Sequence, residues 1–142
     1  GRIRAADLPE RLRARAGKGL MRRVEEEFVE DIFDHEQCLV VTGEDGQILL
    51  SGCAHNGILN ILNRYHEIFH GYPDRVISGF HLARKAAYSQ EDLLGIQEIA
   101  GRLLKTGALY DTGHCTGMEA FAVMKEIMGD RLEYIHSGEQ VL

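Results

Sequence analysis

The chain has 142 residues, of which 44% are hydrophobic and 27% charged, and its formal net charge is −6. No apolar run approaches the roughly 18 residues that span a bilayer, and no signal peptide is visible. The three cysteines, an odd number, argue against a disulfide framework. These features exclude a membrane protein and a disulfide-stapled secreted domain, and they indicate a soluble cytoplasmic domain with one core.

Charge is distributed unevenly along the chain. Residues 1–23 hold eight Lys and Arg against two acids, a local charge of +6, whereas residues 24–142 carry −12. Such a basic segment can contact nucleic acid or an anionic substrate. We favour a solvated amphipathic helix or a segment that packs on its own acidic body. The acidic remainder argues against an extended nucleic-acid groove.

Residues 1–30 are expected to form a basic helical or loop lead segment. Asp7 as N-cap and Pro9 in the first turn predict a helix start there, which Gly17 and Gly19 interrupt. The rest of the chain, residues 31–142, is expected to be one folded unit.

A hairpin opens that unit, followed by alternating helices and strands. Residues 38–42 and 47–51 are the expected hairpin strands, joined by the turn sequence GEDG. A capping box at Ser89 and Asp92 starts one helix, and Thr116 and Glu119 offer another. Further strands are expected at 75–79, 108–112 and 131–136. An earlier helix carries apolar residues at 3.6-residue spacing: Ile58, Leu59, Ile61, Leu62, Tyr65, Ile68 and Phe69.

Three histidines each follow a short apolar run. They are His55 in SGCAHNG, His81 in VISGFHL and His114 in DTGHCTG, separated by 26 and 33 residues. Each interval holds one expected helix and one expected strand, so the three imidazoles should meet at one sheet edge. Neutral imidazole nitrogens bind zinc, iron, manganese or nickel. The sequence therefore predicts a metal site of His55, His81 and His114.

These boxes resemble the C-terminal half of a metallo-β-lactamase-fold hydrolase. The similarity is to the branch with GC(S/A)H(P/A)G, GGFHL and HCTG boxes, which includes proteins similar to the methanopterin-pathway ribofuranosylaminobenzene phosphate synthase. It covers residues 31–142, including the approach FDHEQCLVVTGEDGQILLSGCAH. The resemblance implies an α/β fold, half of an αββα sandwich with a mixed sheet flanked by helices.

The superfamily's usual N-terminal H-x-H-x-D-H ligand loop is not found in these 142 residues. We therefore expect a C-terminal fragment, inactive alone, whose partner is the missing N-terminal half or a second copy of the chain. The superfamily usually places Asp where this branch carries His81.

The resemblance implies a metal-dependent hydrolase that uses metal-activated water on an anionic or phosphorylated small molecule. The cofactor would be one or two divalent ions, zinc by preference, with iron or manganese as alternatives. A non-hydrolytic metal-binding, redox or sensing module on the same scaffold is the alternative function. A purely structural role for the boxes also stays open.

Other candidate residues have weaker patterns. Glu36, with His35, could aid proton transfer, but we favour a packing and hydrogen-bonding role. Cys115 could be a redox-sensitive thiol or soft ligand, but a buried small residue is the favoured interpretation. Ordinary surface or hydrogen-bonded roles are expected for His66, His70 and His136.

Overall fold

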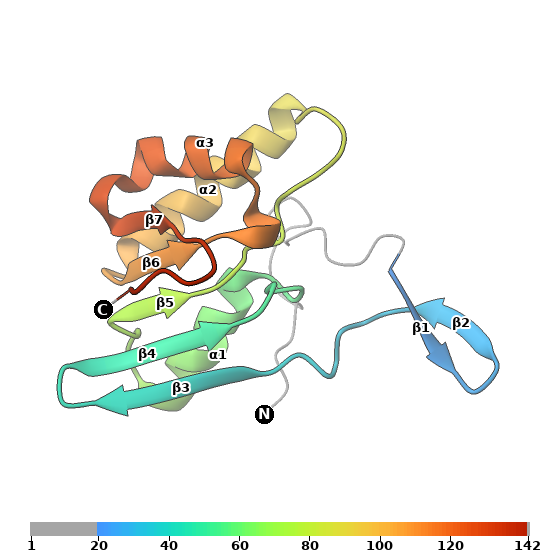
Figure 1. Cartoon of the computed structure of the whole chain (residues 1–142), viewed down its shortest axis with the longest axis horizontal. Helices are drawn as coiled ribbons and strands as arrows, with labels where there is room; N and C mark the ends of the chain where they lie inside the picture. The colour runs from blue at the N-terminus through green and yellow to red at the C-terminus, as the bar shows by residue number, and fades with distance from the viewer. Residues whose placement is uncertain (1–19, 142) are drawn as a thin grey trace.

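The computed structural model describes residues 20–141, which form a mixed α/β architecture (Figure 1). A five-stranded sheet has the order β3-β4-β5-β6-β7. Its strands are β3 (Cys38–Gly43), β4 (Gly46–Ser51), β5 (Arg75–Ile77), β6 (Leu109–Thr112) and β7 (Leu132–Tyr134). The helices are α1 (Ile58–Phe69), α2 (Gln90–Lys105) and α3 (Met118–Met128), with short 3-10 turns η2 (His114–Thr116) and η3 (Gly129–Arg131).

The pairing of the strands decides where their ends lie. Strand β3 pairs antiparallel with β4, as the hairpin prediction required, and β4 through β7 pair parallel to one another. The carboxyl ends of parallel strands meet at the same edge of a sheet. The loops that follow β4, β5 and β6 therefore emerge together.

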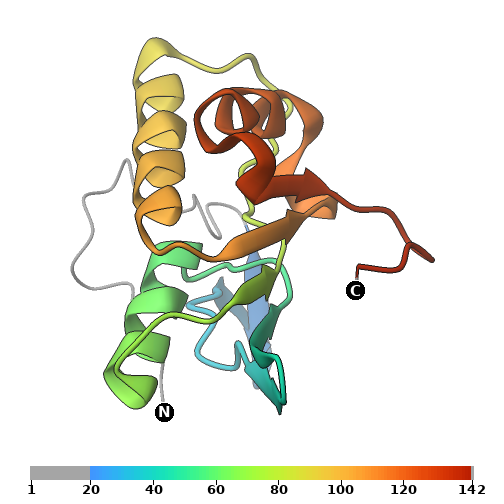
Figure 2. The same ribbon diagram turned by 90° about the vertical axis from the view of Figure 1, so that its left-hand side faces the viewer.

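The three helices cover one face of the sheet (Figure 2). Alternate strand residues point to this face, among them Leu49, Val76 and Tyr110, each at most 1% exposed. The opposite face carries their sequence neighbours, and on β3 it includes Leu39 and Val41, which are 59% and 44% exposed. One face of the sheet is thus the core, and among residues 20–141 the other face is exposed at β3 and more buried toward β6, where Asp111 is 4% exposed.

Helix prediction from the sequence was right for α1 and α2 and partly wrong for α3. The Ser89 and Asp92 capping box of α2 is present. Helix α3 has Gly117 as its N-cap and no side-chain cap, because the Thr116 hydroxyl accepts a hydrogen bond from the Phe80 backbone N–H instead. The Thr116 and Glu119 capping box is therefore wrong. No helix in residues 20–141 is long and apolar enough to cross a membrane.

The lead segment needs a correction. Strands β1 (Met21–Val24) and β2 (Glu27–Glu30) form an antiparallel hairpin where helix or loop was expected. Figure 1 shows this hairpin beside the five-stranded sheet and not within it. The expected helix start at Asp7 and Pro9 lies outside the described residues.

Candidate metal centre

The three predicted histidines lie at the ends of three adjacent parallel strands. His55 follows β4, His81 follows β5, and His114 opens η2 directly after β6. The predicted convergence at one sheet edge is confirmed by this topology. His55 and His81 are half-buried, whereas His114 is exposed.

His55 and His81 form a close pair of imidazoles. Their ring centroids are 4.3 Å apart, and the rings are tilted by 53°. The Nδ1 atom of each ring is buried without a hydrogen-bond partner among the described residues. The Phe33 ring stacks on His55 at 4.0 Å with an interplanar angle of 8°. The pair is therefore held by packing while two ring nitrogens stay available.

Glu36 fixes the loop that carries His55. Its carboxylate accepts hydrogen bonds from the backbone N–H groups of His55 (2.5 Å) and Asn56 (3.0 Å), and from the Asn56 amide (2.7 Å). That amide also donates to the Phe33 carbonyl at 3.0 Å. The expected hydrogen-bonding role of Glu36 is confirmed.

The local charges favour a neutral imidazole at His81. Burial lowers the pKa of His81 below its ordinary value, and the nearby His55 and His114 lower it further. Glu36 acts in the opposite direction. A neutral imidazole has the free lone pair that metal binding needs.

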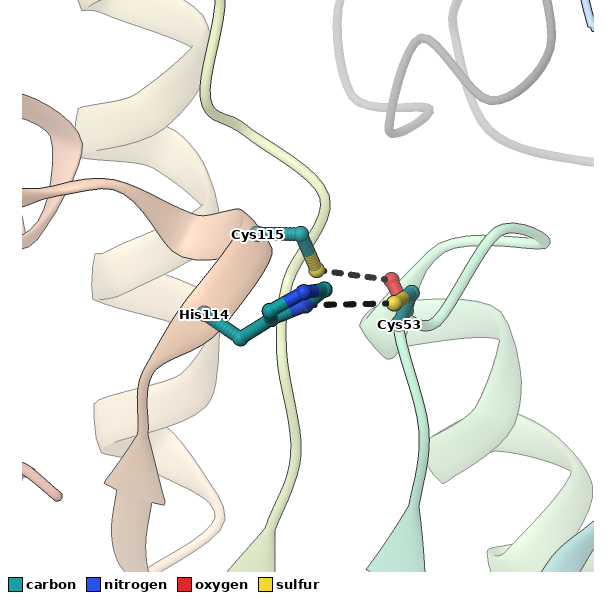
Figure 3. A group of neighbouring side chains, drawn as sticks. All are labelled: Cys53, His114 and Cys115. Carbon is teal, nitrogen blue, oxygen red and sulfur yellow. Dashed lines mark hydrogen bonds between the residues drawn. The ribbon is translucent and has the colours of Figure 1, made fainter. Parts of the chain in front are cut away.

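His114 lies beside two thiols that come from different loops (Figure 3). The Cys53 Sγ atom, in the loop after β4, is 3.6 Å from His114 Nδ1. The Cys115 Sγ atom is 3.7 Å from the Cys53 carbonyl oxygen. Burial raises the pKa of the Cys115 thiol to about 12, and its contact with Cys53 adds to this shift. All three cysteines of the chain are free thiols.

Sequence reasoning missed Cys53 as part of the site. The sequence shows only that Cys53 stands two residues before His55 in the same SGCAHNG box. Its contact with His114 spans 61 residues of sequence, so no local pattern could reveal it.

Left-handed backbone conformations gather at this edge. Ala54, His81 and His114 have φ values of 50°, 52° and 49°. Non-glycine residues rarely adopt this region, and each such residue costs on the order of 1–3 kcal/mol unless its surroundings impose it. The fold therefore holds the two predicted ligands His81 and His114 in strained conformations, a feature that clusters at functional sites.

His66, His70 and His136 have surface roles, as expected. His66 Nδ1 lies 3.2 Å from the Gly71 carbonyl, and His70 is the left-handed C-cap of α1. His136 Nδ1 lies 3.3 Å from a Glu139 carboxylate oxygen. For His35 a packing and hydrogen-bonding role was favoured, but its side chain is exposed, with the ring 5.8 Å from the Phe33 ring and Nδ1 3.9 Å from an Asp31 carboxylate oxygen.

A hollow of about 340 Å³ opens beside the exposed His114. It is lined by polar groups from the ends of β4, β5 and β6 and from the segment after β7. They include Cys53, Ser78, Thr112, His114 and His136. A small molecule can therefore reach His114 from solvent.

The donors at this edge fit a divalent metal ion. The buried Nδ1 atoms of His55 and His81 have no hydrogen-bond partner among the described residues, and in the tautomer protonated at Nε2 each offers a lone pair to a metal ion. Imidazole and thiolate are the ligands that zinc and related ions prefer. The chemistry of the site therefore agrees with the metal that the sequence suggests.

Comparison with known proteins finds likenesses in sequence and in structure, although no family model matches the chain. It is 31% identical over 123 residues to 7,8-dihydropterin-6-methyl-4-(beta-D-ribofuranosyl)-aminobenzene-5'-phosphate synthase of Methanocaldococcus jannaschii. It also superimposes on the crystal structure of Tm1679, a metal-dependent hydrolase of the β-lactamase superfamily, with a TM-score of 0.71 and 28% identity.

The likenesses cover most of this chain and about half of each relative. The alignments include 85% and 90% of this chain, but 40% of the synthase and 48% of the Tm1679 chain. The mixed sheet flanked by helices matches the fold expected from the three histidine boxes. The chain therefore has a metallo-β-lactamase-like fold, and it is similar in sequence and structure to a metal-dependent hydrolase of the β-lactamase superfamily.

Proposed function

We propose that this chain forms part of a metal-dependent hydrolase that acts on an anionic or phosphorylated small molecule. His55, His81 and His114 are the residues proposed to hold one or two divalent ions, with zinc as the preferred ion. The structural neighbour Tm1679 is a metal-dependent hydrolase of the β-lactamase superfamily, which supports the reaction class. The chain spans less than half of the two relatives, so the activity of a whole protein is part of the proposal.

One observation carries the proposal: two buried imidazole nitrogens without partners lie at one sheet edge. An unsatisfied buried polar atom costs about 1–3 kcal/mol. The two rings lie 4.3 Å apart on the loops after two parallel strands. A single ion bound between them would satisfy both nitrogens. A divalent ion bound here would lower the pKa of a bound water and polarise the bond under attack.

The surrounding groups favour an anionic substrate. Helices α1 and α3 begin just after His55 and His114, and neither has a side-chain cap on its first N–H groups. Free N–H groups and the helix dipole attract negative charge at helix N-termini. These two helix starts would therefore bind and orient a phosphate or carboxylate beside the metal ligands.

Metal binding is the first readout of this proposal. Equilibrium dialysis with Zn²⁺ should show binding by the chain, and His55→Ala and His81→Ala should each weaken it at least about tenfold. The exposed His66, in the last turn of α1, provides the matched control His66→Ala. Binding that survives both site variants, or that falls equally in the control, would contradict the proposed site.

Turnover of a phosphate ester is the second readout. We expect little turnover by these 142 residues alone and substantial turnover in a chain that also carries an upstream H-x-H-x-D-H segment. Zinc-dependent turnover lost in His55→Ala supports hydrolysis. Tight metal binding with no turnover in the longer chain would favour the non-hydrolytic alternative.

A further inference from the structure

We propose that Cys53, His114 and Cys115 form a second, thiolate-containing site for a divalent ion of the zinc class. Their ligand atoms all lie within 4.8 Å of one another. This site shares His114 with the proposed hydrolase centre, but it depends on two thiols that the hydrolase proposal does not use. Figure 3 shows the two sulfur atoms and the imidazole facing a common space.

The distances suit an ion after a small contraction. Zinc–sulfur bonds of about 2.3 Å and zinc–nitrogen bonds of about 2.0 Å place tetrahedral ligand atoms about 3.5–3.8 Å apart. Cys53 Sγ and His114 Nδ1 already lie at 3.6 Å. The widest pair, at no more than 4.8 Å, needs to close by about 1 Å. Side-chain rotation can supply a movement of that size.

The fold builds space for the Cys115 thiol. A Cβ atom placed on Gly79 would lie 2.5 Å from Cys115 Sγ, so a larger residue here would displace the sulfur from its present position. The Gly79 N–H donates to the Gly52 carbonyl at 2.9 Å, which ties the loop of Cys53 to the end of β5. This bond holds the loop after β4 beside the loop after β5, and it thereby helps to keep the Cys53 and Cys115 thiols close together.

The η2 turn is anchored on its other side. The Cys115 carbonyl accepts a hydrogen bond from the Ala83 N–H at 2.8 Å, and the buried Thr116 hydroxyl accepts one from the Phe80 N–H at 2.8 Å. His114 and Cys115 are thus held between β6 and the loop after β5. Preorganised ligands on a supported turn are what a metal site requires.

The ligand set indicates the kind of ion. Two thiols and one imidazole select soft or borderline ions such as zinc over magnesium or calcium. Three protein ligands leave a fourth position for water or a small molecule. That position would face solvent, because His114 is exposed and both it and Cys53 line the 340 Å³ hollow.

Cobalt titration under a non-thiol reductant tests the site, since a thiolate bound to Co²⁺ gives an intense near-ultraviolet charge-transfer band. We expect this band in the unaltered chain, a weaker band and at least about tenfold weaker binding in Cys53→Ser and Cys115→Ser, and none in the double variant. Cys38→Ser is the matched control and should keep the band. Absence of the band, or its persistence in the double variant, would overturn the proposal.

Histidine variants separate this proposal from the hydrolase proposal. His55→Ala and His81→Ala should keep the charge-transfer band even where they reduce zinc binding. If cobalt binds through His55 and His81 without the band, the hydrolase site stands and the thiolate site fails. If the band remains and no binding depends on His55 or His81, the reverse holds.

Alkylation of the unaltered chain gives a readout that needs no variant. Zn²⁺ should slow the modification of Cys53 and Cys115 by iodoacetamide at least about tenfold and leave Cys38 unchanged, as followed by peptide mass spectrometry. Equal rates with and without Zn²⁺ at all three thiols would overturn the proposal.

Discussion

The Glu36 carboxylate accepts a hydrogen bond from the His55 backbone N–H at 2.5 Å, across 19 residues of sequence. Its second oxygen accepts hydrogen bonds from the backbone N–H and from the side-chain amide of Asn56. One carboxylate therefore fixes the turn that presents His55, while the Phe33 ring fixes the imidazole plane. The position of His55 therefore depends on a segment before the sheet as well as on β4.

Replacing Glu36 by glutamine should loosen this turn. Glutamine has one acceptor oxygen and an NH₂ group that would face the N–H donors, so at least one of them loses its partner. We expect a loss of about 1–3 kcal/mol in unfolding free energy and at least about tenfold weaker Zn²⁺ binding. Glu44→Gln, on the exposed turn of the β3-β4 hairpin, is the control. Equal urea midpoints for the two variants would contradict the assignment.

Adding a methyl group at Gly79 should be costly. The new Cβ would lie 2.5 Å from Cys115 Sγ and 3.5 Å from two carbonyl oxygens. Overpacking of this kind costs about 1–3 kcal/mol, so Gly79→Ala should lower the melting temperature. Gly101→Ala in α2 meets nothing within 4 Å and should stabilise the protein by about 0.5–1 kcal/mol. Calorimetry of the two variants checks whether the melting temperature falls in Gly79→Ala and rises in Gly101→Ala.

The stability of the protein should fall at alkaline pH through Tyr110. Burial raises the pKa of this phenol well above its ordinary value, although its hydrogen bond with Thr106 acts in the opposite direction. Below pH ~10 the phenol is protonated in both the folded and unfolded states, so Tyr110 makes its full contribution to the unfolding free energy there. Above that pH the unfolded chain ionises first, and the unfolding free energy falls by up to about 1.4 kcal/mol per pH unit.

Urea unfolding between neutral and alkaline pH measures this dependence. Tyr110→Phe removes the ionisable group and keeps the ring, so its unfolding free energy should decline less steeply with pH. It should also be less stable at neutral pH by about 1 kcal/mol, because the hydrogen bond between the Tyr110 and Thr106 hydroxyls is lost, although the Thr106 hydroxyl keeps its bond to the Leu103 carbonyl. Parallel declines for the two proteins would exclude Tyr110 as the cause.

The sheet face exposed at β3 should promote self-association. Leu39 and Val41 are exposed on β3, an edge strand, and exposed apolar patches and strand edges favour association. We expect the weight-average sedimentation coefficient to rise with concentration. A Leu39→Lys and Val41→Lys double variant should remove this rise. Leu94→Lys, at an exposed position on α2, should keep it, and a concentration-independent monomer for the unaltered chain would contradict the expectation.

Local patterns predicted many of the elements. Helical spacing identified the residues of α1, and the turn sequence between 42 and 47 identified the β3-β4 hairpin. Apolar spacing predicted burial less well, since Ile68 and Phe69 at the end of α1 are 50% and 42% exposed. The expected strand 75–79 is also shorter in the structure, where β5 ends at Ile77.

The β1-β2 hairpin escaped prediction for a related reason. Half of its strand residues are charged and most are exposed, so neither strand carries the alternating apolar pattern by which a strand is recognised. The charge-rich sequence favoured helix or loop instead. The hairpin is held by cross-strand pairing, such as that of Arg22 with Val29, and backbone pairing of this kind leaves no pattern in the sequence.

The sequence by itself determined which strand ends carry His55, His81 and His114, because short apolar runs and helix starts are local features. Tertiary structure alone decided which atoms meet. It placed the His55 and His81 rings 4.3 Å apart, yet turned His114 toward Cys53. The physical reason is that side-chain contacts across parallel strands depend on register, loop anchoring and backbone angles such as the left-handed φ of His81 and His114. Those quantities are set by the packed sheet and by the Glu36 and Gly79 contacts, not by any neighbouring residue in the sequence.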